Sequence, residues 1–217
     1  MFNIIKYIKE EAKVIKDRDP AIKSTIEVIL YPSFYAILNH RVAHKFYTKR
    51  HYFLARWISQ QSRKKTGIEI HPGAIIGKGL FIDHGMGVII GETCEIGDNV
   101  TLYQGVTLGG TGKEHGKRHP TIGNGVMVSA GARILGSFKV GNNSRIGSGS
   151  VVLDEVPDEC TVVGIPGRIV KRENKKINPC KNLDQTHLPD PVKMEICKLT
   201  RRIEQLENKI NIVQEEN

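Results

Sequence analysis

An aliphatic residue recurs at six-residue intervals through the middle of the chain, between Ile70 and Val152. The recurring positions are Ile70, Ile76, Ile82, Ile90, Ile96, Leu102, Leu108, Ile122, Val128, Ile134, Val140, Ile146 and Val152. Glycine often follows the aliphatic residue, and the position four residues after it is often small or apolar. Hexapeptides of this kind each form one short strand and a corner, and three of them complete one coil of about 18 residues. The pattern therefore predicts a mainly β fold, a parallel β-helix in which equivalent side chains stack in an apolar column.

The residues before these repeats have helical periodicity. Ile4, Ile8, Ala12 and Ile15 share one helical face, and residues 34–64 keep the same kind of spacing. Asp19-Pro20 has the form of an N-cap followed by a first-turn proline, which predicts the start of a second helix. We therefore expect an N-terminal helical domain over residues 1–66 and a β-helix domain over residues 67–170.

The residues after the repeats divide into two parts. Residues 171–191 are charged and contain three prolines, which is typical of a linker. In residues 192–217 the apolar side chains follow the a and d positions of a short coiled coil, namely Ile196, Leu199, Ile203, Leu206, Ile210 and Val213. We expect this tail to self-associate. Isoleucine at a with leucine at d favours two strands, whereas a β-helix of this type favours three chains, so the sequence leaves the strand number open.

Composition restricts the classes of partner and compartment. The formal charge of +9 favours an anionic partner, but the basic runs such as Arg63-Lys64-Lys65 contain no aromatic residues, which argues against nucleic acid. No long apolar run and no signal-peptide pattern occurs, so we expect a cytoplasmic protein that does not bind membranes. The four cysteines lie far apart without a C-x-x-C pair, which argues against a disulfide framework and a structural zinc site.

Two insertions interrupt the six-residue repeat. The spacing from Ile82 to Ile90 is eight residues and includes Asp83-His84-Gly85, and the spacing from Leu108 to Ile122 is 14 residues and includes a loop over residues 109–120. A solenoid tolerates insertions only at its corners, where they project outward and commonly carry functional sites. We therefore expect the chemistry of the protein at these two insertions.

The motifs in and around the insertions resemble those of the serine O-acetyltransferase family. The segments that carry the resemblance are Ile82–Glu92 (IDHGMGVIIGE), Gly109–Lys113 (GGTGK), Arg118-His119-Pro120 and Gly164–Val170 (GIPGRIV). The resemblance covers roughly residues 17–170. It implies an enzyme that transfers acetyl from acetyl-CoA to the hydroxyl of L-serine, giving O-acetylserine and CoA, which is the first step of cysteine biosynthesis from serine. It also implies a left-handed β-helix, and because parallel crossovers are normally right-handed, the handedness rests on the resemblance alone.

Acetyl transfer to a hydroxyl needs a base that takes the hydroxyl proton and returns it to the leaving thiolate, and a histidine suits both steps. His84 lies two residues after an aliphatic position, where side chains of the repeat face outward. The resemblance implies that Glu69, which stands where aspartate is common in the family, orients this histidine. Fifteen residues separate Glu69 from His84, three fewer than a full coil, so the insertion would have to bring them together.

Serine is a zwitterion, so its site needs an anionic group for the ammonium and a cationic group for the carboxylate. The resemblance implies Asp19 and Asp83 for the ammonium, Arg118 for the carboxylate and His119 near the hydroxyl. Asp19 also fits the helix-capping role given above, and one residue can fill both roles. For coenzyme A, the resemblance implies the positions Gly110, Ala130, Arg145 and Ser148, with Arg145 as a phosphate partner.

No metal is expected, because the histidines within the repeats, His71, His84, His115 and His119, do not have the coil spacing that a shared metal would need. The resemblance implies a homotrimer with active sites between chains, in which loop 109–120 serves the His84 of a neighbour. Only about 66 residues precede the repeats, which favours a trimer over the hexamer of longer members. The chain ends in Glu215-Glu216-Asn217, without the terminal isoleucine that the family docks into O-acetylserine sulfhydrylase, and this argues against that complex.

Two alternatives stay open. A related hexapeptide enzyme that acetylates a sugar or xenobiotic hydroxyl would not need the paired charges of Asp83 and Arg118. A structural β-helix scaffold without enzymatic activity would leave both corner insertions without a purpose.

Overall fold

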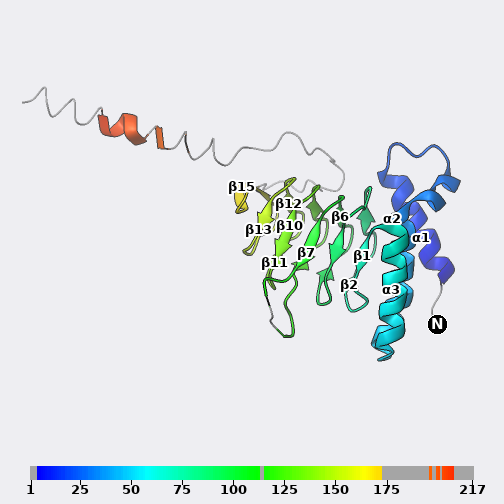
Figure 1. Cartoon of the computed structure of the whole chain (residues 1–217). Helices are drawn as coiled ribbons and strands as arrows, with labels where there is room; N and C mark the ends of the chain where they lie inside the picture. Colours follow the sequence, from blue (N-terminus) through cyan, green and yellow to red (C-terminus); the bar gives the residue numbers. More distant parts are fainter. Residues whose placement is uncertain (1–3, 113–114, 173–195, 197–198, 201, 208–217) are drawn as a thin grey trace, which may run out of the picture.

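The computed structural model of the protein describes residues 4–112, 115–172, 196, 199–200 and 202–207. The helical segments at its N-terminal end are α1 (Ile4–Arg18), the 3-10 helix η1 (Thr25–Leu30), α2 (Pro32–Thr48) and α3 (Tyr52–Thr66). The short strands that follow are β1 (Glu69–Ile70), β2 (Ile75–Ile76), β3 (Phe81–Ile82), β4 (Ile89–Ile90), β5 (Glu95–Ile96), β6 (Thr101–Leu102), β7 (Thr107–Gly109), β8 (Thr121–Ile122), β9 (Met127–Val128), β10 (Arg133–Leu135), β11 (Lys139–Val140), β12 (Arg145–Ile146), β13 (Val151–Val152), β14 (Cys160–Val163) and β15 (Arg168–Arg172). Figure 1 shows the helices stacked against one end of the coil of strands.

The strands form three parallel sheets, one for each face of the coil. Face A has the order β1-β4-β7-β10-β13, face B has β11-β8-β5-β2, and face C has β14-β12-β9-β6-β3 with β15 added antiparallel to β14. Ile89 pairs with Thr107, 18 positions along the chain, which is the predicted length of one coil. Thr107 pairs with Arg133, 26 positions along, because the loop of residues 109–120 lies between them. The mainly β fold and the corner positions of both insertions are thus confirmed.

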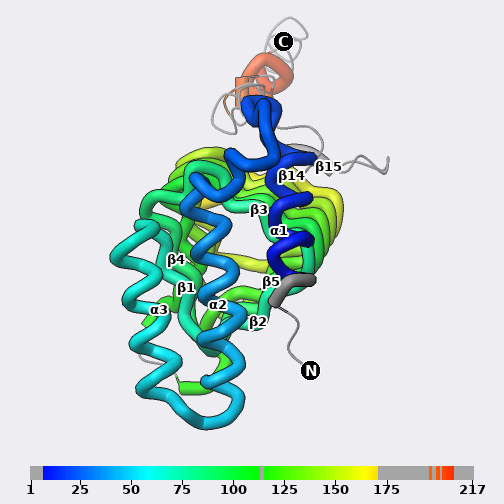
Figure 2. Tube along the Cα trace, turned by 90° about the vertical axis from the view of Figure 1, so that its right-hand side faces the viewer, coloured from blue at the N-terminus to red at the C-terminus, as the bar shows by residue number. Residues whose placement is uncertain are grey.

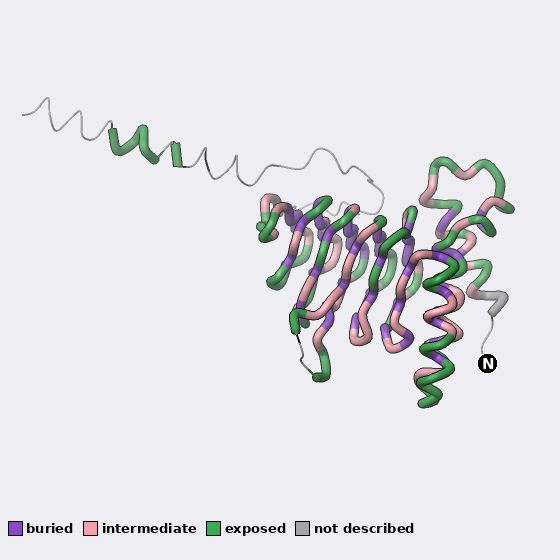
Figure 3. Tube along the Cα trace, in the orientation of Figure 1, coloured by how far each residue is buried: buried purple, intermediate pink, exposed green. Residues whose placement is uncertain are grey.

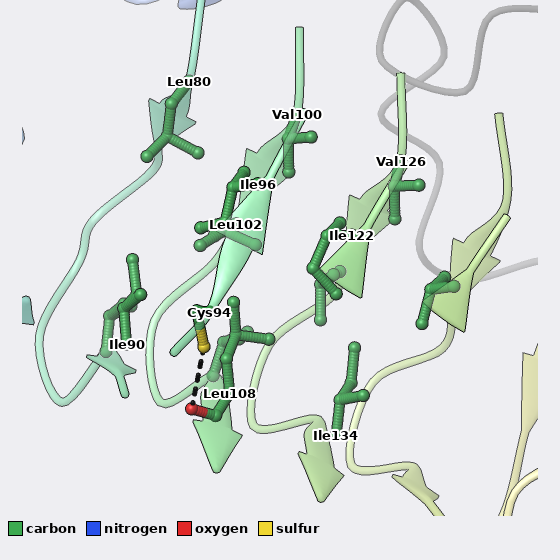
Figure 4. Close-up of a cluster of buried hydrophobic side chains, with 14 of the residues drawn as sticks. Leu80, Ile90, Cys94, Ile96, Val100, Leu102, Leu108, Ile122, Val126 and Ile134 are labelled. Atoms are coloured by element: carbon green, nitrogen blue, oxygen red, sulfur yellow. Dashed lines mark hydrogen bonds between the residues drawn. The ribbon is translucent and has the colours of Figure 1, made fainter. Parts of the chain in front are cut away.

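The predicted apolar column is the core of the coil. Each aliphatic position of the six-residue pattern is buried, and the most exposed of them, Ile76, keeps only 7% of its surface accessible. Figure 4 shows these side chains pointing inward from successive coils, together with Cys94, whose Sγ donates to the carbonyl of Leu108. In Figure 3 the buried residues follow the inside of the coil. Burial of each such side chain stabilises the fold by about 1.5–3 kcal/mol.

The helices cover the first coil, which has no preceding coil to pair with its carbonyl groups. Unpaired strand edges are prone to aggregation, and here side chains of α2 and α3 occupy them. The donors and their carbonyl acceptors are Arg41 to Ile76 and Gly77, His44 to Pro72, and Ser59 to Ile70. Ala36 and Ile37 of α2 join the apolar core from the same end. In Figure 2, which views the molecule along the coil, α2 lies across this end.

Three details of the sequence prediction need correction. No helix begins at Pro20: Oδ1 of Asp19 accepts a hydrogen bond from the Ala21 N–H within a turn, and η1 begins only after Ser24, whose hydroxyl caps it. The structure instead directs the second carboxylate oxygen of Asp19 toward Tyr31, as described below. Ile8 is 40% exposed because α1 turns Ile15 and Glu11 toward the protein. The last strand, β15, extends to Arg172 and pairs with β14, beyond the predicted end of the β-helix at residue 170.

The C-terminal predictions fall largely outside the described residues. Most of the linker, Cys180, Cys197, Ile210 and Val213 are among the residues that are not described. The described parts of the tail are helical, and their predicted a and d side chains, Ile196, Leu199, Ile203 and Leu206, are all exposed in the single chain. The two remaining cysteines, Cys94 and Cys160, are both buried. Among the described residues, none of the helices has the length and apolar character that crossing a bilayer requires.

Glu11 on α1 is a buried carboxyl group, 3% exposed, and its Oε2 has no hydrogen-bond partner among the described residues. Burial raises the pKa of Glu11 from 4.5 to about 7, although Arg41 opposes the shift. A carboxyl with a raised pKa binds its proton more tightly in the folded chain, so its contribution to stability is present below pH 4.5 and is lost as the pH rises through about 7.

We therefore expect Glu11→Gln to increase the free energy of unfolding by about 1–3 kcal/mol at pH 8 and to change it little at pH 4.5. Urea unfolding of both proteins at the two pH values, at one protein concentration, measures this difference. An effect of equal size at both pH values would contradict the assignment.

Candidate active site

The first insertion places His84 on an exposed corner between faces C and A. Asp83 follows β3 directly, and the next residue, His84, has a left-handed backbone conformation with φ of 58°. The imidazole of His84 is 74% exposed, and its Nε2 lies 3.9 Å from Oδ1 of Asp83. The side chain therefore points outward, as its place in the repeat predicts, with a carboxylate beside it. We use the name C–A corner for the turn that leads from face C to face A, in this coil and in the later ones.

Asp19 meets Asp83 at the same corner, although 64 positions separate them in the chain. Arg18 fixes the end of α1 on the second coil through contacts to the carbonyl of Val100 and the hydroxyl of Thr101. Tyr31 donates its hydroxyl proton to Oδ2 of Asp19 at 2.5 Å. Burial, and to a smaller degree the neighbouring Asp19, raises the pKa of Asp83, while His84 lowers it. The corner thus combines an exposed imidazole with two carboxyl groups that repel each other.

The second insertion places Arg118 on the next corner, between faces A and B. Nη2 of Arg118 pairs with Oε2 of Glu92, which follows β4, at 2.5 Å. Oε1 of Glu92 accepts a hydrogen bond of 2.9 Å from the hydroxyl of Tyr47 on α2. These two donors lower the pKa of Glu92, with the Tyr47 hydroxyl as the largest cause. The other guanidinium donors of Arg118 have no partner within the described parts of the chain, so they are available to an anion.

His119 is fixed at this A–B corner by Thr93. The backbone N–H of Thr93 donates to Nδ1 of His119 at 3.2 Å, and the Thr93 hydroxyl lies 2.9 Å from the same nitrogen. Because Nδ1 accepts, the neutral ring carries its proton on Nε2. Burial, followed by the charge of Arg118, lowers the pKa of His119, which favours this neutral form. Lys117 anchors the base of the loop through the carbonyl of Thr93 and the carboxylate of Glu95.

A pocket of about 380 Å³ lies beside this second group of residues, lined by Tyr47, Tyr52, Arg56, His71, Pro72 and Glu92. His71 accepts a hydrogen bond from the N–H of Gly73, and burial lowers the pKa of its ring to about 4. His71 is therefore neutral and forms part of the turn.

The predicted contact between Glu69 and His84 is not present. The carboxylate of Glu69 instead pairs with Arg63 at 3.2 Å and with Arg56 at 3.6 Å, both from α3. Among the described residues, no ion pair joins Glu69 to His84, and the carboxylate paired with the imidazole is Asp83. The physical reason is that α3 packs against β1 and presents two cations to Glu69. A role of Glu69 in orienting His84 stays a prediction that would require this carboxylate to leave its two arginines.

The predicted coenzyme positions do not all lie together. Ala130 and Ser148 occupy the C–A corner on later coils, in line with His84, because the corner residues hydrogen-bond from coil to coil: Gly105 to Met86, Gly131 to Gln104, and Gly149 to Ala130. Gly131 and Gly149 both have positive φ, and the space where a Cβ would stand is open. Gly110 lies instead at the A–B corner, beside the backbone of Arg118. Arg145 lies on face C in strand β12.

The predicted site residues therefore divide between two corners of one chain. Asp19, Asp83 and His84 lie at the C–A corner, and Arg118 and His119 lie at the A–B corner. Face A, with strand β4 (Ile89–Ile90), separates the two corners. The exposed imidazole of His84 and its two neighbouring aspartates thus lie at one corner, and the remaining guanidinium donors of Arg118 lie at the other.

The sequence reasoning missed three residues at these corners. Glu92 stands within a recognised motif, two residues after the inward-facing Ile90, and its position in that motif was the available signal. Tyr31 and Tyr47 gave no signal, because their contacts to Asp19 and Glu92 depend on how the helices pack on the coil. Among the described residues, no group of three or more metal-binding side chains comes together.

Comparison with known proteins places this chain among acyltransferases with hexapeptide repeats. Residues 119–154 match the family model described as bacterial transferase hexapeptide (six repeats). The serine acetyltransferase of Bacillus pumilus is 57% identical over 206 residues, which cover 94% of each chain. The crystal structure of serine acetyltransferase from Vibrio cholerae is 40% identical, with a TM-score of 0.80 over 85% of this chain and 71% of that chain. A Brucella abortus serine acetyltransferase in complex with coenzyme A is 43% identical, with a TM-score of 0.75 over 77% of this chain and 68% of that chain. These likenesses agree with a left-handed β-helix.

Proposed function

Because this chain belongs to the serine acetyltransferase family, we propose how its two corners together transfer acetyl from acetyl-CoA to L-serine. The activity is that of the family: the hydroxyl of L-serine attacks the thioester of acetyl-CoA and yields O-acetylserine and CoA, the step that leads from serine to cysteine. The observation that supports the assignment of roles is the exposed imidazole of His84 beside Asp83 and Asp19 at one corner, with Arg118 at the next.

His84 is the general base in this proposal. Its imidazole removes the proton of the serine hydroxyl as the oxygen forms a bond to the thioester carbonyl carbon. When the bond from that carbon to sulfur breaks, the protonated imidazole returns the proton to the CoA thiolate. Asp83, 3.9 Å from Nε2, stabilises the cationic imidazole between these two steps. The exposure of His84 allows both substrates to reach it.

Asp83 and Asp19 bind the serine ammonium in this proposal. Burial, and to a smaller degree the nearby Asp19, raises the pKa of Asp83, and an ammonium group between the two carboxylates would relieve their repulsion. The free donors of Arg118 bind the serine carboxylate as a fork, while Glu92 holds the opposite side of the guanidinium. Nε2–H of His119 is oriented to donate to an oxygen of the substrate.

We infer a homotrimer, because one chain separates these two groups across face A. If the C–A corner of one protomer faces the A–B corner of the next, each cleft between chains combines His84 and Asp83 with Arg118 and His119. Serine then binds between protomers, and a single chain is inactive. The exposed a and d side chains of the C-terminal helix, such as Leu199 and Ile203, supply a further surface for self-association.

Acetyl-CoA lies along the C–A corner in this proposal. Ala130 and Ser148 follow His84 on successive coils, and the open space at Gly131 and Gly149 allows the pantetheine arm to approach the backbone. Gly110, at the other corner, contributes from the neighbouring protomer. Arg145 on face C is the proposed phosphate partner.

The experiment for the proposed function is an assay of CoA thiol release from acetyl-CoA with a panel of hydroxyl acceptors. We expect release with L-serine and no comparable release with sugars or with an antibiotic hydroxyl. Preferred acetylation of a sugar would support the alternative hexapeptide enzyme, and absence of release with every acceptor would support the scaffold. Repeating the assay after exhaustive treatment with a chelator tests the expectation that no metal is needed.

A single added methyl group tests the role of His119. A Cβ at Gly91 would lie 2.0 Å from Cδ2 of the His119 ring, so Gly91→Ala must displace that ring. We expect kcat/KM for serine to fall at least about tenfold and the free energy of unfolding to fall by about 1–3 kcal/mol. Steady-state kinetics and urea unfolding measure the two effects.

Gly112→Ala is the matched control, because a Cβ at Gly112 meets no atom within 4 Å and its φ is not positive. Equal kinetics of the two variants would contradict a role for His119 at the site.

A further inference from the structure

Two of the charged side chains that we assign to serine binding, Asp19 and Arg118, are held by tyrosines at opposite ends of α2. Tyr31 caps the N-terminal end of this helix, and Tyr47 lies in its last turn. One tyrosine reaches Asp19 directly, and the other reaches Arg118 through Glu92. Helix α2 belongs to the helical domain, outside the repeats that carry the family motifs.

At the N-terminal end, the carboxylate of Asp19 is fixed at both oxygens. Oδ1 accepts from the Ala21 N–H at 2.8 Å, and Oδ2 accepts from the Tyr31 hydroxyl at 2.5 Å. The hydrogen bond to Asp19 is the main reason why the pKa of Tyr31 rises to about 12, so the phenol remains a donor at any physiological pH. With Oδ2 held in this way, the carboxylate has one orientation toward Asp83.

At the C-terminal end, Tyr47 controls Glu92. Its ring packs edge-on against Tyr52, with 5.1 Å between centroids, and against His71, with 5.8 Å. The hydroxyl donates to Oε1 of Glu92, whose other oxygen pairs with Arg118. Burial and the contact to Glu92 raise the pKa of Tyr47, which keeps this phenol a donor too.

Helix α2 is rigidly attached to the first coil. Ile37 is part of the apolar core, and the guanidinium of Arg41 binds the carbonyls of Ile76 and Gly77. A helix rises 1.5 Å per residue, so the Cα atoms of Tyr31 and Tyr47 are about 24 Å apart along its axis. This length carries the helix from the C–A corner to the A–B corner.

We propose that Tyr31 and Tyr47 are positioning residues for serine, and that α2 holds one substrate-binding group at each end. Tyr31 sets the anionic group that binds the ammonium, and Tyr47 sets, through Glu92, the cationic group that binds the carboxylate. The inference rests on the proposed function, because it assumes that Asp19 and Arg118 contact serine. In the trimer, one α2 helix serves two different active sites.

The test compares Tyr31→Phe and Tyr47→Phe, which remove only the hydroxyls and keep the packed rings. We expect KM for serine to rise about 5–30-fold in each variant. This is less than the roughly 10–150-fold effect of directly losing a hydrogen bond to a charged group, because each tyrosine acts on serine through another residue. We expect KM for acetyl-CoA to stay within about twofold of its original value. Tyr35→Phe is the matched control on the same helix, because the Tyr35 hydroxyl has no hydrogen-bond partner within the described part of the chain; it should leave both KM values unchanged.

Two partial analogues of serine separate positioning from a general loss of structure. Ethanolamine lacks the carboxylate and 3-hydroxypropanoate lacks the ammonium, and each is used as an inhibitor competing with serine. Tyr31→Phe should weaken inhibition by ethanolamine and leave inhibition by 3-hydroxypropanoate unchanged, and Tyr47→Phe should do the reverse. A rise in both inhibition constants, or in KM for acetyl-CoA, would mean a structural role and overturn the proposal.

Circular dichroism and molecular mass show whether Tyr47→Phe alters the fold. If it does, Glu92→Gln is a second variant that interrupts the contacts from Tyr47 through Glu92 to Arg118. Asp19→Asn and Arg118→Ala distinguish failure of the inference from failure of the proposed function. If these two variants raise KM for serine and the tyrosine and Glu92 variants do not, only the positioning role fails. If Asp19→Asn and Arg118→Ala also leave KM for serine unchanged, the proposed serine site itself is wrong.

Discussion

Replacing His84 with alanine is expected to lower kcat/KM for L-serine by about 10³-fold, within the range that loss of a general base or acid causes. No other imidazole among the described residues of the C–A corner is available to take the hydroxyl proton, and Asp83 is too weak a base to replace it efficiently. The assay is the release of free thiol from acetyl-CoA at saturating acetyl-CoA, with the serine concentration varied.

His51→Ala is the matched control for this substitution. His51 is an exposed histidine at the start of α3, with its ring centroid 6.3 Å from that of Phe46, and it lies outside both corners. We expect its loss to leave the kinetics unchanged. A His84→Ala enzyme that keeps more than a tenth of the original kcat/KM would refute the role of general base. A similar loss in both variants would indicate damage to the fold.

Combining two inactive variants in mixed trimers is expected to restore about a third of the original activity. His84→Ala damages only the C–A corner, and Arg118→Ala damages only the A–B corner. If each active site takes one corner from each of two neighbouring protomers, every trimer that contains both variants has about one site in three with both corners intact. Each variant alone should have little activity at serine concentrations below the original KM, because loss of a charged contact to the carboxylate weakens binding strongly.

Mixed trimers are formed by co-expression of two differently tagged chains, and activity is measured after sequential affinity purification. A mixture of His84→Ala with Asp83→Ala serves as the control, because both substitutions affect the same corner and no assembly can yield an intact site. No restoration in the test mixture would show that the site lies within one chain. Restoration in the control would contradict the assignment of His84 and Asp83 to one corner. The experiment therefore tests whether two protomers of the proposed trimer form each active site.

The agreement between the repeat pattern and the β-helix has a local cause. Ile90, Leu108 and Ile134 each point into the core because the strand before a corner has only one inward side chain, and the chain must return there every six residues. The contacts that stabilise a coil come from the equivalent positions of the coils before and after it. Such a fold is encoded in the spacing alone, and insertions are recognisable because they break that spacing.

The site was predictable only in part. His84 and Arg118 stand within motifs at the two interruptions, so their places on corners followed from the spacing. The carboxylate that pairs with His84 could not be predicted from the spacing, because the choice between Glu69 and Asp83 depends on which cations approach each carboxylate. Arg56 and Arg63 reach Glu69 only because α3 folds back along β1. Asp19 was predicted to cap a helix, and the structure uses its carboxylate to bind Tyr31 instead.

The order of residues along the chain was thus sufficient for the coil, its three faces and the corners that carry the chemistry, because those features arise from a short period repeated many times. The packing of α1, α2 and α3 on the first coil decided which charged groups meet. Contacts between residues as distant as Tyr47 and Glu92 have no period, and their geometry depends on the angle at which a helix lies across the end of the coil. The division of the site between two corners of one chain likewise depends on the tertiary structure, because the arrangement of the three faces of the coil sets the positions of the corners.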